Sequence, residues 1–169
     1  LKACGVNVAG QIKQVTYYDP YVRSPIVGRL FLDTVAALQA INSAKIAIVL
    51  RTEVPVSDRG QPWLINHAWP DSDAAEKGLM AYAERLDLDL KVEIQKVPHG
   101  RYMVCRLEGG REVQIVMDQG FGAWCLPRDS NQRFAFAAAP SAQAADLSAV
   151  KGPVRRQSHQ LSYLVAVAD

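Results

Sequence analysis

Short apolar runs alternate with stretches of helical periodicity in the N-terminal half of the chain, and this alternation limits the possible folds more than any other feature. Residues Ile12 to Tyr18 are rich in β-branched and aromatic side chains and end at Asp19-Pro20, which predicts a strand that stops in a turn. The next apolar residues share one helical stripe: Val27, Leu30, Phe31, Val35, Leu38 and Ile41. The short run Lys45 to Leu50 then predicts a buried parallel strand, which completes a β-α-β unit.

A second helix and a third strand continue the alternation. Asp73 and Glu76 have the spacing of a capping box, and Leu79 and Leu86 belong to the apolar face of the helix that would follow. Apolar and polar residues alternate from Leu90 onward, which is typical of a half-buried strand near the edge of a sheet.

A glycine pair separates the next two candidate strands. Arg101 to Leu107 and Glu112 to Met117 flank Gly109-Gly110, and glycine tolerates the positive φ angles of a tight hairpin turn. We therefore expect an α/β fold with a mixed sheet, built as β-α-β-α-β followed by a β-hairpin, with helices flanking the sheet.

The chain has the size of a single globular domain. With 169 residues, of which 49% are hydrophobic, we expect one domain over 1–169, with a core at about 13–124 and a C-terminal extension at 125–169. In that extension, Phe134 to Ala139 is a candidate strand and Leu161 to Ala168 resembles a closing strand. Thr52 to Pro70 has no period and predicts an excursion between elements, in which Trp63 and Trp69 are expected to cover an apolar edge of the sheet.

Composition excludes several classes of protein. The 19 basic and 17 acidic residues nearly balance, which argues against a broad nucleic-acid surface, so any anion site must be local. The three cysteines form no CxxC pair, and we predict no disulfide framework, no metal and no cofactor. No apolar run reaches about 18 residues, so we expect a soluble protein. The chain begins at Leu1 without a signal pattern, which predicts a piece cut from a longer protein, and the cysteine pattern favours a reducing compartment, so the expected location is cytoplasmic.

Cationic side chains follow several of the predicted strands. His99 and Arg101 stand two residues apart at the start of a strand, so their side chains project to the same side. The carboxyl ends of parallel strands meet at one edge of a sheet, where ligands gather. The sequence therefore predicts a phosphate-sized anion site at this edge, formed by Asp19, Tyr21, Arg23, His99, Arg101 and the backbone N–H groups of Gln119 and Gly120.

The motifs HGRY, beginning at His99, and DPYVR, beginning at Asp19, resemble those of a known superfamily. HGRY, an apolar strand, a glycine turn, a further strand and a G-x-G are similar to one half of the phospholipase D superfamily. Together with DPYVR, the pattern is closest to the C-terminal phospholipase D-like domain of MIT-domain-containing proteins. Over Lys13 to Trp124 this resemblance implies a mixed sheet between helices, a dimer, and binding of acidic phospholipids at membranes without hydrolysis.

The sequence departs from the catalytic members of that superfamily. Their motif is H-x-K-x-x-x-x-D, and here Arg101 takes the lysine position and Arg106 the aspartate position. Arginine can still grip a phosphate through paired charge-assisted hydrogen bonds. A degenerate motif therefore favours a binding module over an enzyme.

Three functions are consistent with these patterns. The favoured one is a non-catalytic phosphate-binding module that recognises acidic phospholipid or another phosphate-bearing ligand and targets a larger protein. The first alternative is a dimeric phosphodiesterase or nuclease in which His99 is the nucleophile. The second is a protein-interaction scaffold in a multi-subunit assembly. Expected partners are the phosphate-bearing ligand and a second copy of the chain or other subunits, whereas the net charge of +2 does not indicate nucleic acid.

Overall fold

The computed structural model describes residues 11–53, 69, 71–118, 120–123 and 163–168. The helices and strands within these residues follow one another as β1 (Ile12–Tyr18), α1 (Pro25–Ala40), β2 (Ala47–Thr52), α2 (Ser72–Arg85), β3 (Asp89–Ile94), β4 (Arg101–Leu107), η2 (Glu108–Gly110), β5 (Glu112–Met117), η3 (Gly120–Ala123) and β6 (Tyr163–Ala168).

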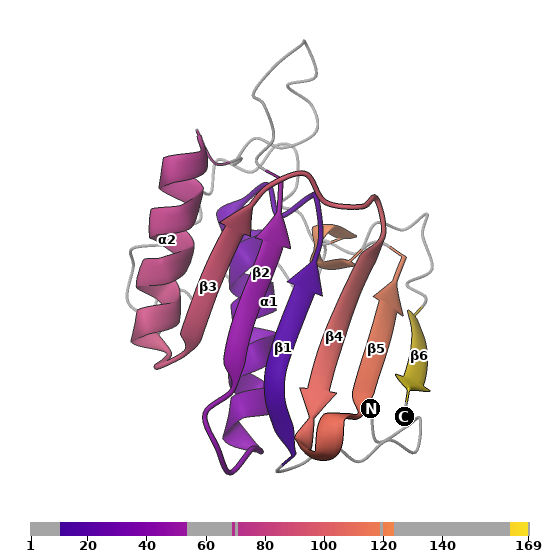
Figure 1. Ribbon diagram of the computed structural model, residues 1–169. Coiled ribbons are helices and arrows are strands. Elements are labelled where there is room, and N and C mark those ends of the chain that lie inside the picture. Colours follow the sequence, from indigo (N-terminus) through magenta and orange to yellow (C-terminus); the bar gives the residue numbers. More distant parts are fainter. Residues whose placement is uncertain (1–10, 54–68, 70, 119, 124–162, 169) are drawn as a thin grey trace.

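The strands form one mixed sheet of six, in the order β3-β2-β1-β4-β5-β6 (Figure 1). β1, β2 and β3 are parallel, whereas β4, β5 and β6 each run antiparallel to the preceding neighbour in the sheet. The predicted α/β class with a mixed sheet is thereby confirmed, and β3 lies at an edge as its alternating pattern predicted.

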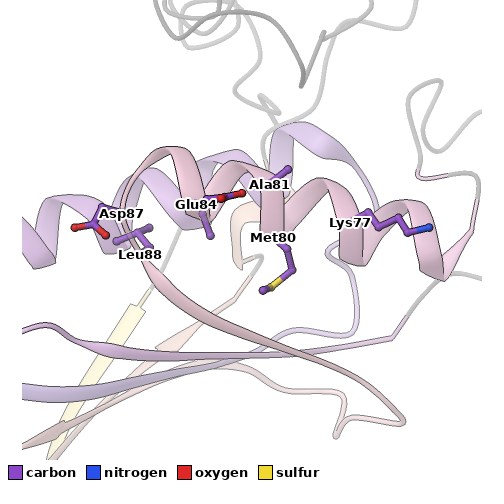
Figure 2. Close-up of a pocket in the computed structure, with 7 residues that line it drawn as sticks. Lys77, Met80, Ala81, Glu84, Asp87 and Leu88 are labelled. Carbon is purple, nitrogen blue, oxygen red and sulfur yellow. The ribbon is translucent and has the colours of Figure 1, made fainter.

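Both helices lie on the same face of the sheet. The connections β1-α1-β2 and β2-α2-β3 step across the sheet in the same direction, and crossovers of constant hand place such helices on one side. α1 contacts α2, α2 contacts β3, and Figure 2 shows the two helix ribbons over the same side of the strands. The opposite face, which we call the open face, has no described helix over it.

The core lies between this helical layer and the sheet. The ring of Phe31 on α1 stacks on that of Tyr17 on β1 with centroids 5.0 Å apart. The register of β1 against β4 shifts between Ile12 and Gln14, so Ile12 and Val15, although three residues apart, both become buried. Each large apolar side chain buried in this layer stabilises the fold by roughly 1.5–3 kcal/mol.

A glycine permits the close contact of α1 with α2. A Cβ atom on Gly28 would lie 2.6 Å from Cδ2 of Leu79 and 3.8 Å from the ring of Trp69. Trp69 is buried, and its backbone N–H donates to the carbonyl of Arg23 over 2.9 Å. Its ring therefore packs against α1 and belongs to the buried core, while the expected cover over an edge of the sheet stays a prediction.

Three local predictions have different outcomes. The predicted helix start at Asp73 is wrong, because Asp71 is the N-cap and its Oδ1 accepts from the backbone N–H of Ala74 over 2.8 Å. The hairpin turn is as predicted, with positive φ angles at Gly109 (79°) and Gly110 (88°). The closing strand is confirmed as β6, whereas Phe134 to Ala139 and Trp63 lie outside the described residues.

Candidate anion-binding site

The chain turns immediately after β1 around a buried carboxylate. Asp19 is 0% exposed, and its Oδ2 accepts a hydrogen bond from the hydroxyl of Tyr17 over 2.7 Å. Its Oδ1 accepts from the backbone N–H of Tyr21 over 2.8 Å, which is the geometry of an aspartate that holds its own turn. Asp19 therefore positions Tyr21, and both of its oxygens are already occupied by neutral donors.

Tyr21 lies at the centre of the predicted cationic groups. The guanidinium carbons of Arg23 and Arg101 lie over its ring, 4.5 and 4.4 Å from the centroid. Its hydroxyl lies 2.9 Å from Nδ1 of His99, and the two rings are 5.5 Å apart. The structure thus brings together side chains from the turn after β1 and from the start of β4.

Arg101 is held by groups on both sides. Its Nη1 donates to the backbone carbonyl of Asp118 over 2.7 Å, beyond the end of β5. Its Nε lies 3.6 Å from Oδ1 of Asp19, an ion-pair distance too long for a hydrogen bond. The Nε atoms of Arg23 and Arg101 are both buried and have no hydrogen-bond partner among the residues that the structure describes, which is costly for a charged donor.

Gly120 closes the inner side of this site. It has a φ of 54°, and a Cβ atom there would lie 2.6 Å from the hydroxyl of Tyr17, 2.7 Å from Oδ2 of Asp19 and 2.9 Å from Cδ of Arg101. The glycine is required for this close approach as well as for its backbone conformation. Gln119, the other predicted residue of this turn, lies outside the described residues.

Burial changes the acidity of the groups beneath the cations. The pKa of Asp19 is raised, chiefly because burial disfavours its charged form, although the hydrogen bonds from Tyr17 and Tyr21 and the charges of Arg101 and Arg23 act in the opposite direction. The pKa of Tyr17 is raised well above its usual value by burial and by the neighbouring Asp19. Tyr17 therefore keeps its hydroxyl proton and continues to donate a hydrogen bond to the carboxylate of Asp19.

The arrangement is suited to binding an anion. Arginine donors recognise the oxygens of a phosphate in a fixed planar geometry. Arg106, at the position of the aspartate in the catalytic motif, is paired with Glu112 at 2.8 Å next to the hairpin turn, at the opposite end of β4 from Arg101. Among the residues that the structure describes, no group of three or more His, Cys, Asp or Glu could hold a metal ion.

Sequence reasoning missed the residues that support the site from below. Tyr17 holds Asp19, and Phe121 packs its ring edge-on against that of Tyr17, with centroids 5.3 Å apart. Tyr17 ends a buried alternation in β1, so its burial could have been predicted, but its partner in η3 is distant in sequence. A stacked pair on the open face, Tyr18 and Tyr102, was also not anticipated.

A hollow of about 480 Å³ lies elsewhere, along the outer side of α2 (Figure 2). It is lined by Lys77, Met80 and Glu84 of the helix and by Asp87 and Leu88, which lead into β3. These residues lie toward the start of β3, whereas the anion site lies beyond the ends of β1 and β5. The hollow is thus separate from the site described above.

The sequence matches, over residues 2–168, the family model of the C-terminal domain of the DEAD/DEAH box helicase YjiV. The chain belongs to this family. No curated protein matches it. The resemblance to the phospholipase D superfamily, and to the C-terminal domain of MIT-domain-containing proteins, is therefore wrong. The shared features, HGRY, a glycine hairpin and DPYVR, are short, and a β-α-β-α-β order with a hairpin is found in unrelated families.

The family also corrects the function that was favoured from the sequence. A phosphate-binding module that targets a larger protein to acidic phospholipids is not what a helicase C-terminal domain indicates, so this interpretation is wrong. Within the described residues, no helix is long and apolar enough to span a bilayer. The cytoplasmic location, the dimer and the single-domain boundaries stay predictions.

Proposed function

We propose that this domain serves a helicase by holding the sugar-phosphate backbone of nucleic acid at Arg23, His99 and Arg101. A helicase acts on nucleic acid, and phosphate contacts supply most of the affinity of proteins for such polymers. The observation that carries the proposal is the convergence of two guanidinium groups on one tyrosine ring, next to an exposed imidazole.

The spacing of the two arginines suits a phosphodiester chain. Since their guanidinium carbons lie 4.5 and 4.4 Å from the same centroid, at most about 9 Å separates them. They can share one phosphate or contact two successive ones. Asp19, near Arg101, offsets only part of this charge, because a single carboxylate faces two guanidinium groups.

The low net charge is compatible with a contact of this kind. A chain with a formal charge of +2 does not wrap nucleic acid, but it can hold a few phosphates at one place. Such a domain would give a larger helicase one additional contact with nucleic-acid phosphates. It would show weak binding with a shallow dependence on salt, because few counterions are released.

Fluorescence anisotropy with a labelled 12-nucleotide strand tests the proposal. We expect Arg23→Ala and Arg101→Ala each to weaken binding about tenfold, the value of a charge-assisted hydrogen bond. Each variant should also reduce the slope of log K against log salt by about 1. The matched control is Lys77→Ala, which removes an exposed cation of α2 whose partner is Asp73.

Unchanged binding by the arginine variants would contradict the proposal. If the arginine variants bind the strand as tightly as Lys77→Ala does, at the same salt concentration, the site does not hold nucleic-acid phosphates. Circular dichroism of each variant checks that the fold is retained.

A further inference from the structure

We infer that the open face of the sheet, at Tyr102, stacks a base of a single-stranded nucleic acid whose phosphates bind at Arg23 and Arg101. This inference rests on the proposed function and adds to it the form of the nucleic acid. It is carried by a column of planar groups that crosses the sheet next to the anion site.

The column begins at an arginine and continues through two tyrosines. The rings of Tyr18 and Tyr102 stack with centroids 4.4 Å apart and planes 17° from parallel. The guanidinium carbon of Arg51 lies 5.2 Å from the centroid of Tyr18, and its Nη1 donates to the hydroxyl of Tyr18 over 2.8 Å. An ion pair of 2.7 Å with Glu93 fixes Arg51 in turn. The column is therefore anchored on its β2 and β3 side.

The column ends at Tyr102. In the register of the sheet, Tyr18 pairs with Arg51 and Tyr102, and Tyr102 pairs with Val116 of β5. The side chain of Val116 is shorter than an aromatic ring and is 38% exposed. No aromatic ring or cation of the described residues contacts the second face of Tyr102. A further planar group would thus extend the column above Val116.

The chain connects this column directly to the anion site. Tyr18 immediately precedes Asp19, and Tyr102 immediately follows Arg101. Because side chains alternate along strands, the tyrosines point to the open face while Arg101 points to the helical side. A strand bound by its phosphates at the edge of the sheet can therefore place a base on the open face.

The occupant that fits this geometry is a single strand. Every nucleobase has a π face, and stacking on aromatic side chains is how proteins hold unpaired bases without reading their sequence. In a duplex both faces of an internal base are covered by its neighbours, so its bases cannot join the column. The arginines alone would accept either form of nucleic acid, whereas the tyrosine column favours the unpaired one.

The test separates bases from phosphates. The probes are a 12-nucleotide oligothymidylate and a strand with the same number of phosphates but abasic at every position. We expect the wild-type protein to bind oligothymidylate more tightly than the abasic strand. Tyr102→Leu should weaken oligothymidylate binding about tenfold and leave the abasic strand unchanged, since only the stacking surface is lost.

A conservative variant guards against effects on folding. Tyr102→Phe keeps the ring and should bind oligothymidylate as the wild type does, whereas a merely destabilised protein would lose both probes together. Binding of a 12-nucleotide oligouridylate is measured as well, because a stacking site tolerates any base. We expect Tyr102→Leu to bind this strand, too, more weakly than the wild type does.

The two proposals fail in different ways. If the wild type binds the abasic strand and oligothymidylate equally, or if Tyr102→Leu weakens neither base-bearing strand, the stacking inference is overturned while the arginine dependence still supports the phosphate site. If Arg23→Ala and Arg101→Ala change nothing, the proposed function itself fails. A third outcome also overturns the inference. If the wild type is a dimer that Tyr102→Leu converts to a monomer, and the wild type binds oligothymidylate no more tightly than the abasic strand, the open face contacts a second copy of the chain.

Discussion

The hydroxyl of Tyr21 lies 2.9 Å from Nδ1 of His99, although 78 residues separate the two in sequence. The contact joins the turn after β1 to the approach of β4, the two neighbouring strands that run in opposite directions. It is the shortest link between the two motifs that the sequence singled out, and it places the imidazole beside the two arginines on the same tyrosine ring.

The ring of Tyr21 should matter more than its hydroxyl. We expect Tyr21→Leu to weaken oligonucleotide binding about tenfold, because both guanidinium groups lose a surface worth roughly 0.5–1 kcal/mol each. Tyr21→Phe removes only the contact with His99 and should cost about threefold, the lower end for an exposed hydrogen bond. Equal losses in anisotropy measurements would show that the ring does not position the arginines.

Gly120 should tolerate substitution less than another glycine with positive φ. Gly120→Ala meets the left-handed penalty and also forces Tyr17, Asp19 or Arg101 to move, so we expect a loss of about 3 kcal/mol in the free energy of unfolding. Gly109→Ala has a similar φ but nothing within 4 Å, and should lose about 1–2 kcal/mol. Urea denaturation of both variants makes the comparison.

The difference between the two glycine variants separates backbone strain from close packing. A Gly109→Ala variant as unstable as Gly120→Ala would mean that backbone strain alone sets the cost. The close packing of η3 beneath the anion site would then contribute little to the stability of the folded chain.

The order of elements could be read from the sequence because each signal is local. The apolar run of β1, the glycines of the hairpin and the alternation of β3 each reflect neighbouring residues, and all three elements lie where expected. Convergence at the edge followed from the general geometry of parallel strands, and Arg23, His99 and Arg101 do meet at Tyr21.

What the sequence could not supply depended on contacts distant along the chain. The packing of Phe121 against Tyr17 and the stack of Tyr18 on Tyr102 each need the register between strands, which no local pattern sets. Family membership was misjudged for a related reason. Short motifs such as HGRY recur by chance, and only a comparison over nearly the whole chain identified the helicase domain.

The start of α2 offers a simple test of the capping geometry. Asp71→Ala should lower the free energy of unfolding by about 1 kcal/mol, because it removes the acceptor for the N–H of Ala74. Asp73→Ala loses only an exposed ion pair with Lys77 and a favourable charge in the first turn, and should cost about half as much. If the two costs in thermal or urea denaturation were reversed, Asp73 would be the cap after all.

Asp19 should make stability depend on pH in a direction opposite to that of an ordinary paired carboxylate. Its pKa in the folded protein is raised above 3.8 by burial, so the unfolded chain releases this proton first as the pH rises. The contribution of Asp19 to the free energy of unfolding is therefore greatest below about pH 4 and declines until the pKa of the folded state is passed.

Asp19→Asn cannot ionise but can still accept a hydrogen bond. We expect the stability of Asp19→Asn relative to the wild type to improve as the pH rises from 3.5, and then to stay constant once the pKa of Asp19 in the folded protein is passed, as measured by urea denaturation at a series of pH values. A difference between the two proteins that stays constant over this range would mean that the charge on Asp19 is fully compensated by Arg101 and Arg23 and that burial does not govern its ionisation.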